Sequence, residues 1–209
     1  MKEFKIENEI NNFLKNNKIA GYLINQHKKI EELFIKNCLD KIKECEDFDC
    51  LNIIFGEVTQ NVDNFIYSNN NRTVAGNNFL KPASLLKKSC AKGSGFKSAE
   101  LHDFLAENKI IVIDLFSIPL PSEYYRNNLV PKSNEYLKSK AEVIKNLIQT
   151  KKIKSVKCIC RYNDNNVNDL AKIFIDLIKL EVVSMTFDKR ALSNSAGGLD
   201  MEKFNTFIG

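Results

Sequence analysis

The segment Leu51–Tyr67, with the sequence LNIIFGEVTQNVDNFIY, decides the fold class of this chain. It begins as an apolar run typical of a β-strand, stops at a glycine and continues as polar residues that end in aromatic side chains. Strands of a parallel sheet are buried on both faces and read as continuous apolar runs, so polar residues first appear at the carboxyl edge. Ligands of open α/β sheets bind at that edge. The segment therefore predicts a strand over residues 51–55 that leads into a ligand-binding loop.

Three further apolar runs read as strands and alternate with segments of helical periodicity. The strands are predicted over residues 110–115, 156–160 and 181–187, and the helices over 82–90, 99–107, 137–148 and 167–178, with a last helix around Phe204. Strands that alternate with helices are joined by right-handed crossovers and form a parallel sheet. The sequence therefore predicts an α/β protein, a three-layer α/β/α sandwich whose central parallel sheet is four-stranded.

The size of the chain favours one domain. With 209 residues, of which 44% are hydrophobic, it can bury one substantial core but not two independent ones. We expect a single domain over residues 1–209, in which 49–209 form the α/β core. Residues 1–48 read as helical, because apolar residues recur at helical spacing over 30–42, after an earlier helix over 6–14. This segment either completes a helical layer packed on or beside the sheet or binds a partner.

The sequence shows no sign of membrane insertion. No apolar run approaches the roughly 20 residues that a membrane helix needs. The amino terminus, MKEFKIENEI, lacks the apolar centre of a signal peptide. We therefore expect a cytoplasmic protein without membrane contacts, and we expect it to be a monomer.

The cysteines and histidines argue against a metal centre. Six cysteines occur without a CxxC pair, and only two histidines are available to complete a site. We expect neither a metal nor another cofactor. Cys158 and Cys160 lie in a strand-like run and read as buried reduced thiols, whereas His102 reads as a structural or surface histidine.

Three segments point to a function because of the order in which they occur. They are Gly56-Glu57 with the loop that ends in Phe65 and Tyr67, the apolar run Ile111-Val112-Ile113-Asp114, and the polar run Ser193-Asn194-Ser195-Ala196-Gly197-Gly198 with the later Phe204. In this order, over about residues 52–204, the chain resembles the uracil-DNA glycosylase superfamily. The three segments are similar to that family's water-activating motif in its Gly-Glu form, its base-reading strand end and its DNA-intercalating loop.

The resemblance implies hydrolysis of the N-glycosidic bond of a base that is flipped out of DNA. Such a reaction needs a carboxylate near the sugar, donors near the departing base and a surface on which the base stacks. Glu57 and Asp63 are the candidate catalytic acids, and the alternative for either is a loop cap or a solvent-exposed acid. Phe65, Tyr67 and Phe79 are the candidates for stacking against the base, with core packing as the alternative.

Asp114 stands where the resemblance places a base-reading residue, which in the family is commonly asparagine. An ionised aspartate only accepts hydrogen bonds. It repels the carbonyl at position 4 of uracil and accepts from the exocyclic amine of a cytosine-like or adenine-like base. The resemblance therefore predicts a modified or amino-bearing base as the substrate, in DNA repair or in defence against phage DNA. The alternative is that Asp114 caps the following loop or binds Arg126.

The last loop is the predicted DNA-contacting segment, through Lys189, Arg190, Ser193, Asn194 and Ser195. The formal net charge of +5 permits double- or single-stranded DNA as the partner but does not require it. Basic residues are spread along the chain rather than massed in one cluster, so the prediction of DNA rests on the resemblance.

Two departures from the family's pattern favour an alternative function. The family usually has a proline soon after the first motif, where this chain has Val58-Thr59-Gln60, and the family's histidine in the last loop is absent. The alternative is a catalytically inactive glycosylase fold that serves as a DNA-binding or protein-interaction module. A small nucleotide- or nucleoside-processing enzyme of the same architecture is a third candidate, although the chain has no GxGxxG or Walker-type phosphate loop.

Overall fold

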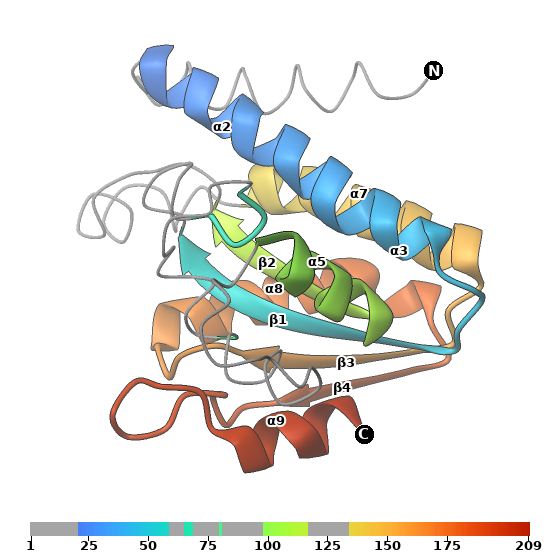
Figure 1. Cartoon of the computed structure of the whole chain (residues 1–209), viewed down its shortest axis with the longest axis vertical. Helices are drawn as coiled ribbons and strands as arrows, with labels where there is room; N and C mark the ends of the chain where they lie inside the picture. The colour runs from blue at the N-terminus through green and yellow to red at the C-terminus, as the bar shows by residue number, and fades with distance from the viewer. Residues whose placement is uncertain (1–20, 59–64, 69–79, 81–97, 117–133) are drawn as a thin grey trace.

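The computed structural model describes residues 21–58, 65–68, 80, 98–116 and 134–209 (Figure 1). Its helices are α2 (Gly21–Phe34), the π-helix η1 (Ile35–Leu39), α3 (Asp40–Glu44), α5 (Ser98–Glu107), α7 (Asn134–Lys151), α8 (Asn165–Ile178), the 3-10 helix η5 (Lys179–Glu181) and α9 (Met201–Ile208). Its strands are β1 (Cys50–Val58), β2 (Ile110–Phe116), β3 (Ser155–Cys160) and β4 (Ser184–Asp188). The helices predicted over 6–14 and 82–90 lie outside the described residues.

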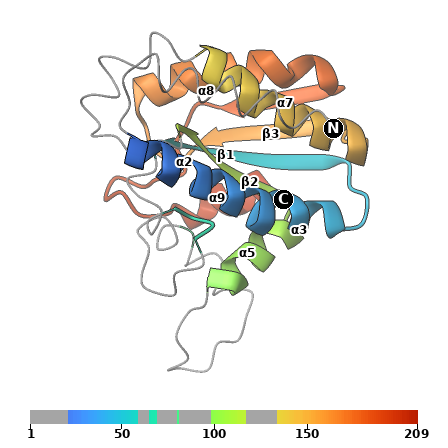
Figure 2. The same ribbon diagram turned by 90° about the horizontal axis from the view of Figure 1, so that it is seen from above.

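The four strands form one sheet, and all of its pairings are parallel. The strand order is β2-β1-β3-β4, so the chain moves from β1 outward to β2 and then back past β1 to β3 and β4. Right-handed crossovers that run in opposite directions put their helices on opposite faces of a sheet. Accordingly, α7 and α8 cover one face, and α5 and α9 cover the other (Figure 2). The predicted α/β class and the four-stranded parallel sheet are confirmed.

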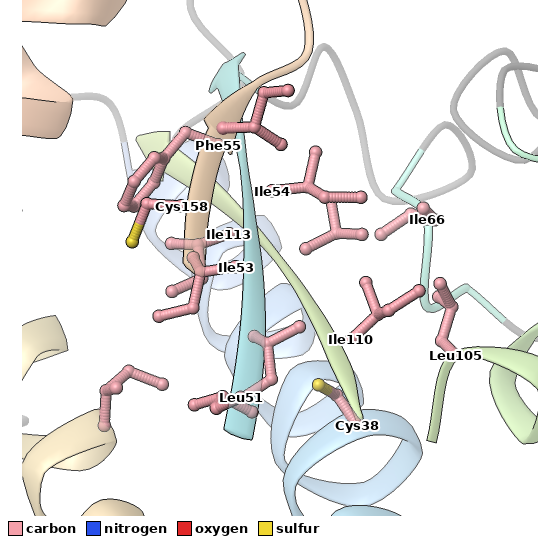
Figure 3. Close-up of a cluster of buried hydrophobic side chains, with 14 of the residues drawn as sticks. Cys38, Leu51, Ile53, Ile54, Phe55, Ile66, Leu105, Ile110, Ile113 and Cys158 are labelled. Atoms are coloured by element: carbon pink, nitrogen blue, oxygen red, sulfur yellow. The ribbon is translucent and has the colours of Figure 1, made fainter. Parts of the chain in front are cut away.

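Both faces of β1 are buried under apolar side chains (Figure 3). Phe55 packs edge-on against Phe174 of α8, with the ring centroids 5.5 Å apart. Ile54 lies on the opposite side, toward Ile66 and Leu105 (Figure 3). Burial of each such side chain stabilises the fold by roughly 1.5–3 kcal/mol. This core fixes the strand register and therefore the positions of the strand ends.

The described part of the amino-terminal segment packs on this core. Phe34, Leu39 and Asp40 keep helical backbone angles, so α2, η1 and α3 follow one another as a continuous helical run. Ile30 and Ile42 are fully buried, in agreement with the predicted helical periodicity of the apolar residues. The helix predicted over the first 48 residues is thus confirmed from residue 21 to 44.

The structure corrects two strand boundaries. β1 was predicted to stop at Gly56. In the structure it continues to Val58 and stays paired with β2 over these residues. Glu57 is therefore a strand residue and does not follow the strand. β4 begins at Ser184 rather than at 181, because residues 179–181 form the 3-10 turn that ends α8.

The cysteines of β3 are buried and free, as predicted. Burial raises the pKa of the Cys160 thiol to about 12 and also raises the pKa of Cys158, so both stay protonated and unreactive near neutral pH. Within the described ranges, no group of His, Cys, Asp and Glu residues could hold a metal ion. In that same part of the chain, no helix is long and apolar enough to cross a membrane.

Candidate functional site

The carboxyl edge of the sheet is where the three segments singled out in the sequence meet. The connections that leave β1 and β3 run in opposite directions, and open α/β sheets bind ligands outside the strand ends at such a switch point. Two backbone hydrogen bonds there link the end of β1 to the Ser193 segment through Arg161. The amide of Arg161, just after β3, donates to the carbonyl of Phe55 at 2.8 Å, and the amide of Ser193 donates to the carbonyl of Arg161 at 3.0 Å.

Asp114 lies against Gly56 across the β1–β2 pairing. The two residues are Cα partners in the parallel register. A Cβ atom at position 56 would lie 2.1 Å from Oδ1 of Asp114 and 3.3 Å from its Cγ. The Asp114 side chain therefore occupies the space that any other residue at position 56 would fill. Glycine inside a strand commonly marks such a close approach. Because Gly56 has no Cβ, β1 stays paired with β2 at this position while the Asp114 side chain lies over it.

The main chain of Asp114 is held by a lysine from the helical layer. Nζ of Lys140, in α7, donates to the Asp114 carbonyl at 2.8 Å, and the Lys140 side chain is 8% exposed. Asp114 itself is half-buried. Strand pairing, the glycine and the lysine together give this carboxylate a defined position. Arg126, the alternative partner predicted for Asp114, lies outside the described residues.

A short turn at residues 65–68 is fastened to β2 and to two helices. The hydroxyl of Tyr67 accepts a hydrogen bond from the amide of Val112 at 2.8 Å. Nδ2 of Asn37, in η1, donates to the Tyr67 carbonyl at 2.8 Å. Nε2 of His102, in α5, lies 3.1 Å from the carbonyl of Ile66 and must carry the proton, because a carbonyl only accepts. His102 is buried, so of its two predicted roles, structural or surface, it has the structural one.

Phe65 and Tyr67 belong to the core rather than to a surface that a base could reach. They are 2% and 0% exposed. Their ring centroids are 5.5 Å apart, and the Tyr67 ring also packs edge-on against Phe34. Burial raises the pKa of Tyr67 well above its usual value and that of its hydrogen-bonded neighbour Cys38 to about 12. Burial thus assigns both aromatic rings to core packing, in place of the predicted base contact.

The segment after β4 forms a tight hairpin from Ser193 to Leu199. These two residues form an isolated antiparallel bridge. Oδ1 of Asn194 accepts hydrogen bonds from the amides of Ala196 and Gly198 at 3.0 and 2.9 Å. The predicted DNA contacts therefore differ in their roles: Asn194 shapes the hairpin with its side-chain oxygen, whereas Ser195 lies exposed at its tip. Ser193 is half-buried and joins the hairpin to β3.

The two predicted cations at this end of β4 are both exposed, but one has an acidic partner. Nε and Nη2 of Arg190 donate to the two carboxylate oxygens of Asp188 at 3.1 and 2.8 Å. These hydrogen bonds lower the pKa of Asp188, so the pair is ionised at neutral pH. Asp188 thus offsets the charge of Arg190 locally. Lys189 is exposed beside it.

Arg161 and Tyr162 are candidate site residues that were not predicted from the sequence. They directly follow β3 at the switch point, and the Arg161 guanidinium lies 4.7 Å from the centroid of the Tyr162 ring. Tyr162 is 38% exposed, so part of its ring is open to a ligand. The signal that could have identified them is the one applied to β1, namely polar residues that begin where a buried strand ends.

The remaining predicted residues are described in part or not at all. Asp63 and Phe79 lie outside the described residues. The backbone of Glu57 belongs to β1, directly after Gly56, and its side chain lies outside the described part of the structure. The structure thus brings Asp114, Gly56 and the Ser193 hairpin to one edge of the sheet. Of the predicted acids Glu57, Asp63 and Asp114, it describes the side chain of Asp114.

Comparisons with known proteins add no assignment to this geometry. No protein-family model matches the chain, and no curated protein or solved structure matches it either.

Proposed function

We propose that this protein is a DNA glycosylase that hydrolyses the N-glycosidic bond of a flipped-out, modified or amino-bearing base. The observation that carries the proposal is the Asp114 side chain fixed against Gly56 at the carboxyl edge of the sheet. A carboxylate held at the ligand edge is an acceptor for an exocyclic amine. A cytosine-like base offers this amine where uracil offers a carbonyl oxygen, which is the reason for the proposed substrate class.

The proposed reaction breaks the bond between C1′ of the sugar and the base nitrogen. The electron pair of that bond leaves with the base, a water oxygen bonds to C1′, and a proton of the water ends on the base. Glu57 and Asp63 are the proposed acids that orient the water and oppose the positive charge on the sugar. The products are the free base and an abasic site.

The proposed DNA contacts surround the same edge. Ser195 at the hairpin tip and the exposed Lys189 are suited to the phosphate backbone. Tyr162, backed by Arg161, takes the stacking role first predicted for Phe65 and Tyr67, because an exposed ring can lie against a base. Phe79 remains a proposed stacking residue.

The first experiment tests base release by the purified protein. Duplex and single-stranded DNA containing uracil, cytosine or a 5-modified cytosine is incubated with the protein, and abasic sites are detected as alkali-labile breaks. We expect release of an amino-bearing base and no release by the Glu57→Gln variant. Asp114→Asn should shift the preference toward uracil by about tenfold or more, because the amide can donate to the uracil carbonyl.

The matched control for Asp114→Asn is Asp49→Asn. Asp49 directly precedes β1, at the opposite end of the strand, and is an exposed partner of Lys154. This variant should keep the base preference of the wild type. Robust release of uracil alone by the wild type would contradict the proposed substrate class.

The second candidate function is a glycosylase fold without catalysis that binds DNA or a protein. Two observations favour it: the Asp188 carboxylate engages Arg190, and the Asn194 side chain serves the hairpin itself. Without these contacts, the Arg190 guanidinium and the Asn194 amide would be available to assist a departing base. Salt-dependent DNA binding without abasic-site formation on any of the tested strands would support this second function.

A further inference from the structure

The edge of the sheet at β2 is closed by side chains instead of by a strand. β2 is the outermost strand of the described sheet on this side. Two of its backbone groups that do not pair with β1 are used by the helical layer and the turn. The amide of Val112 donates to the Tyr67 hydroxyl, and the carbonyl of Asp114 accepts from Nζ of Lys140. Residues two apart in a strand present their backbone groups to the same side, so both contacts lie along one edge.

Lys140 is an unusual choice for such a contact because it is a buried cation. Its Nζ lies 3.4 Å from Oε1 of Glu31 in α2 and 5.9 Å from the centroid of the Phe34 ring. Burying an ammonium group is costly unless a counter-charge and hydrogen-bond acceptors replace the water it loses. Glu31 supplies that charge, and the Asp114 carbonyl supplies an acceptor. A neutral donor could bond the same carbonyl without this cost.

The acid that balances Lys140 comes from the amino-terminal helix. Glu31 is 26% exposed, and Nδ1 of the buried His27 lies 3.8 Å from its Oε1. Burial lowers the pKa of His27, and the nearby Lys140 lowers it further while Glu31 raises it. His27 is therefore neutral at pH 7, which leaves Glu31 and Lys140 as the opposite charges of the cluster. α2, α7 and β2 thus meet at one ion pair.

We propose that Lys140 is a positioning residue for substrate recognition and that Glu31 of α2 is part of the same device. This inference rests on the proposed function and deepens it. Lys140 fixes the carbonyl of Asp114 at the outer edge of β2, Gly56 receives the side chain on the β1 side, and the carboxylate is held where it reads the amine of the base. The role of α2 is then to hold the lysine in place through the ion pair with Glu31, which makes the amino-terminal segment a component of the recognition site.

The test compares Lys140→Met, Lys140→Arg and Glu31→Gln with a control on the same helix. The control is Lys145→Met, since Lys145 forms a surface pair with Glu142 one turn away. Rates and apparent affinities are measured for duplexes with the amino-bearing base and with uracil. In the variants that fold, as judged by circular dichroism, we expect Lys140→Met and Glu31→Gln to lower kcat for the amino-bearing base by about tenfold or more. The preference over uracil should fall with it, Lys140→Arg should restore part of the rate, and Lys145→Met should stay within about twofold of the wild type.

A second measurement keeps the inference separate from the proposed activity. Amide chemical shifts of Gly56 and Asp114 should change in Lys140→Met and Glu31→Gln but not in Lys145→Met. If the wild type releases no base, the proposed function fails, and unchanged shifts in the first two variants overturn the positioning of Asp114 as well. If the wild type is active and a folded Lys140→Met keeps its rate and base preference, the inference is overturned while the proposed function stands.

Discussion

Among single residues, Gly56 and Asp114 depend on each other, because the Asp114 carboxylate occupies the space that a side chain at position 56 would need. Asp114 lies two residues before the end of β2, and its side chain lies over the neighbouring strand because that strand has no Cβ at the paired position. The pair is separated by 58 positions in the sequence, from 56 to 114, and each residue looks ordinary alone. Their contact gives the candidate site its described carboxylate.

The glycine can be tested directly by Gly56→Ala. The added methyl group would lie 2.1 Å from Oδ1 of Asp114, so either the carboxylate or the strand must move. Overpacking of this kind typically costs about 1–3 kcal/mol, and we expect a loss of that size in urea denaturation together with loss of base selectivity. Gly197→Ala is the comparison variant: its positive φ is strained for alanine, so it also loses stability, but no atom lies within 4 Å of the added Cβ and the position of Asp114 and the base selectivity should stay unchanged. A Gly56→Ala protein with wild-type stability and selectivity would contradict the assigned close approach.

At the scale of elements, the edge of β2 and the π-helix η1 form one structural unit. Asn37 and Cys38 both lie in η1, and both bond Tyr67, whose hydroxyl in turn serves Val112 of β2. Short π-helices inside longer helices often occur at functional sites, because the wider turn changes which side chains face inward. Here the wide turn brings two consecutive residues of the amino-terminal segment onto the 65–68 turn.

Tyr67→Phe tests the closure of this edge. The variant keeps the buried ring but removes the hydroxyl, so the buried amide of Val112 loses its acceptor. An unsatisfied buried amide costs about 1–3 kcal/mol, and we expect that decrease in the free energy of unfolding. Tyr162→Phe is the matched control. Because Tyr162 is partly exposed, water can take over any hydrogen bond that its hydroxyl makes. Equal stability of the two variants would show that the hydroxyl of Tyr67 does not support the strand.

At the scale of the whole molecule, the three layers have different tasks. The sheet sets the strand ends, α7 and α8 bury one of its faces, and α5 and α9 cover the other (Figure 2). Two histidines are buried in the helical layers. His27 in α2 lies beside Glu31, and His102 in α5 bonds the carbonyl of Ile66. Their protonation therefore affects the stability of the molecule as a whole.

We expect the protein to lose stability as the pH falls below about 6.5. Burial lowers the pKa of both histidines in the folded state, whereas histidines in an unfolded chain titrate near pH 6.5. Between the lowered folded pKa values and 6.5, the unfolded state binds more protons, so the free energy of unfolding decreases as the pH falls through this window and is fully present above it. Urea denaturation at pH 7.5 and 5.5 measures the difference.

The control for this prediction is the double variant His27→Gln with His102→Gln. Its stability at pH 7.5 will be lower, but its change between the two pH values should be smaller than that of the wild type. A wild type that is equally stable at both values contradicts the sign derived from burial.

Local sequence patterns were enough to predict the four strands, the helices over 99–107, 137–148 and 167–178, and the α/β class. Short apolar runs that alternate with segments of helical periodicity predict strands of a parallel sheet, and both patterns are local, so each element could be recognised from its own residues. Asp114 and the Ser193 segment were predicted from the resemblance to a known family, and the structure places Asp114 inside β2, two residues before the end of that strand. The local patterns misplaced the end of β1, since a glycine looks like a break until the side chain lying against it is known.

The tertiary structure decided which of the marked residues face a site. Phe65 and Tyr67 were candidate base contacts with core packing as the alternative, and the helices from the amino-terminal segment and α5 enclose them in the core. Likewise, Glu31, Lys140 and Asp114 meet only because three elements distant in the sequence pack together. Local patterns reflect the burial of a segment, whereas contacts between segments depend on register and layer order, which no single segment encodes.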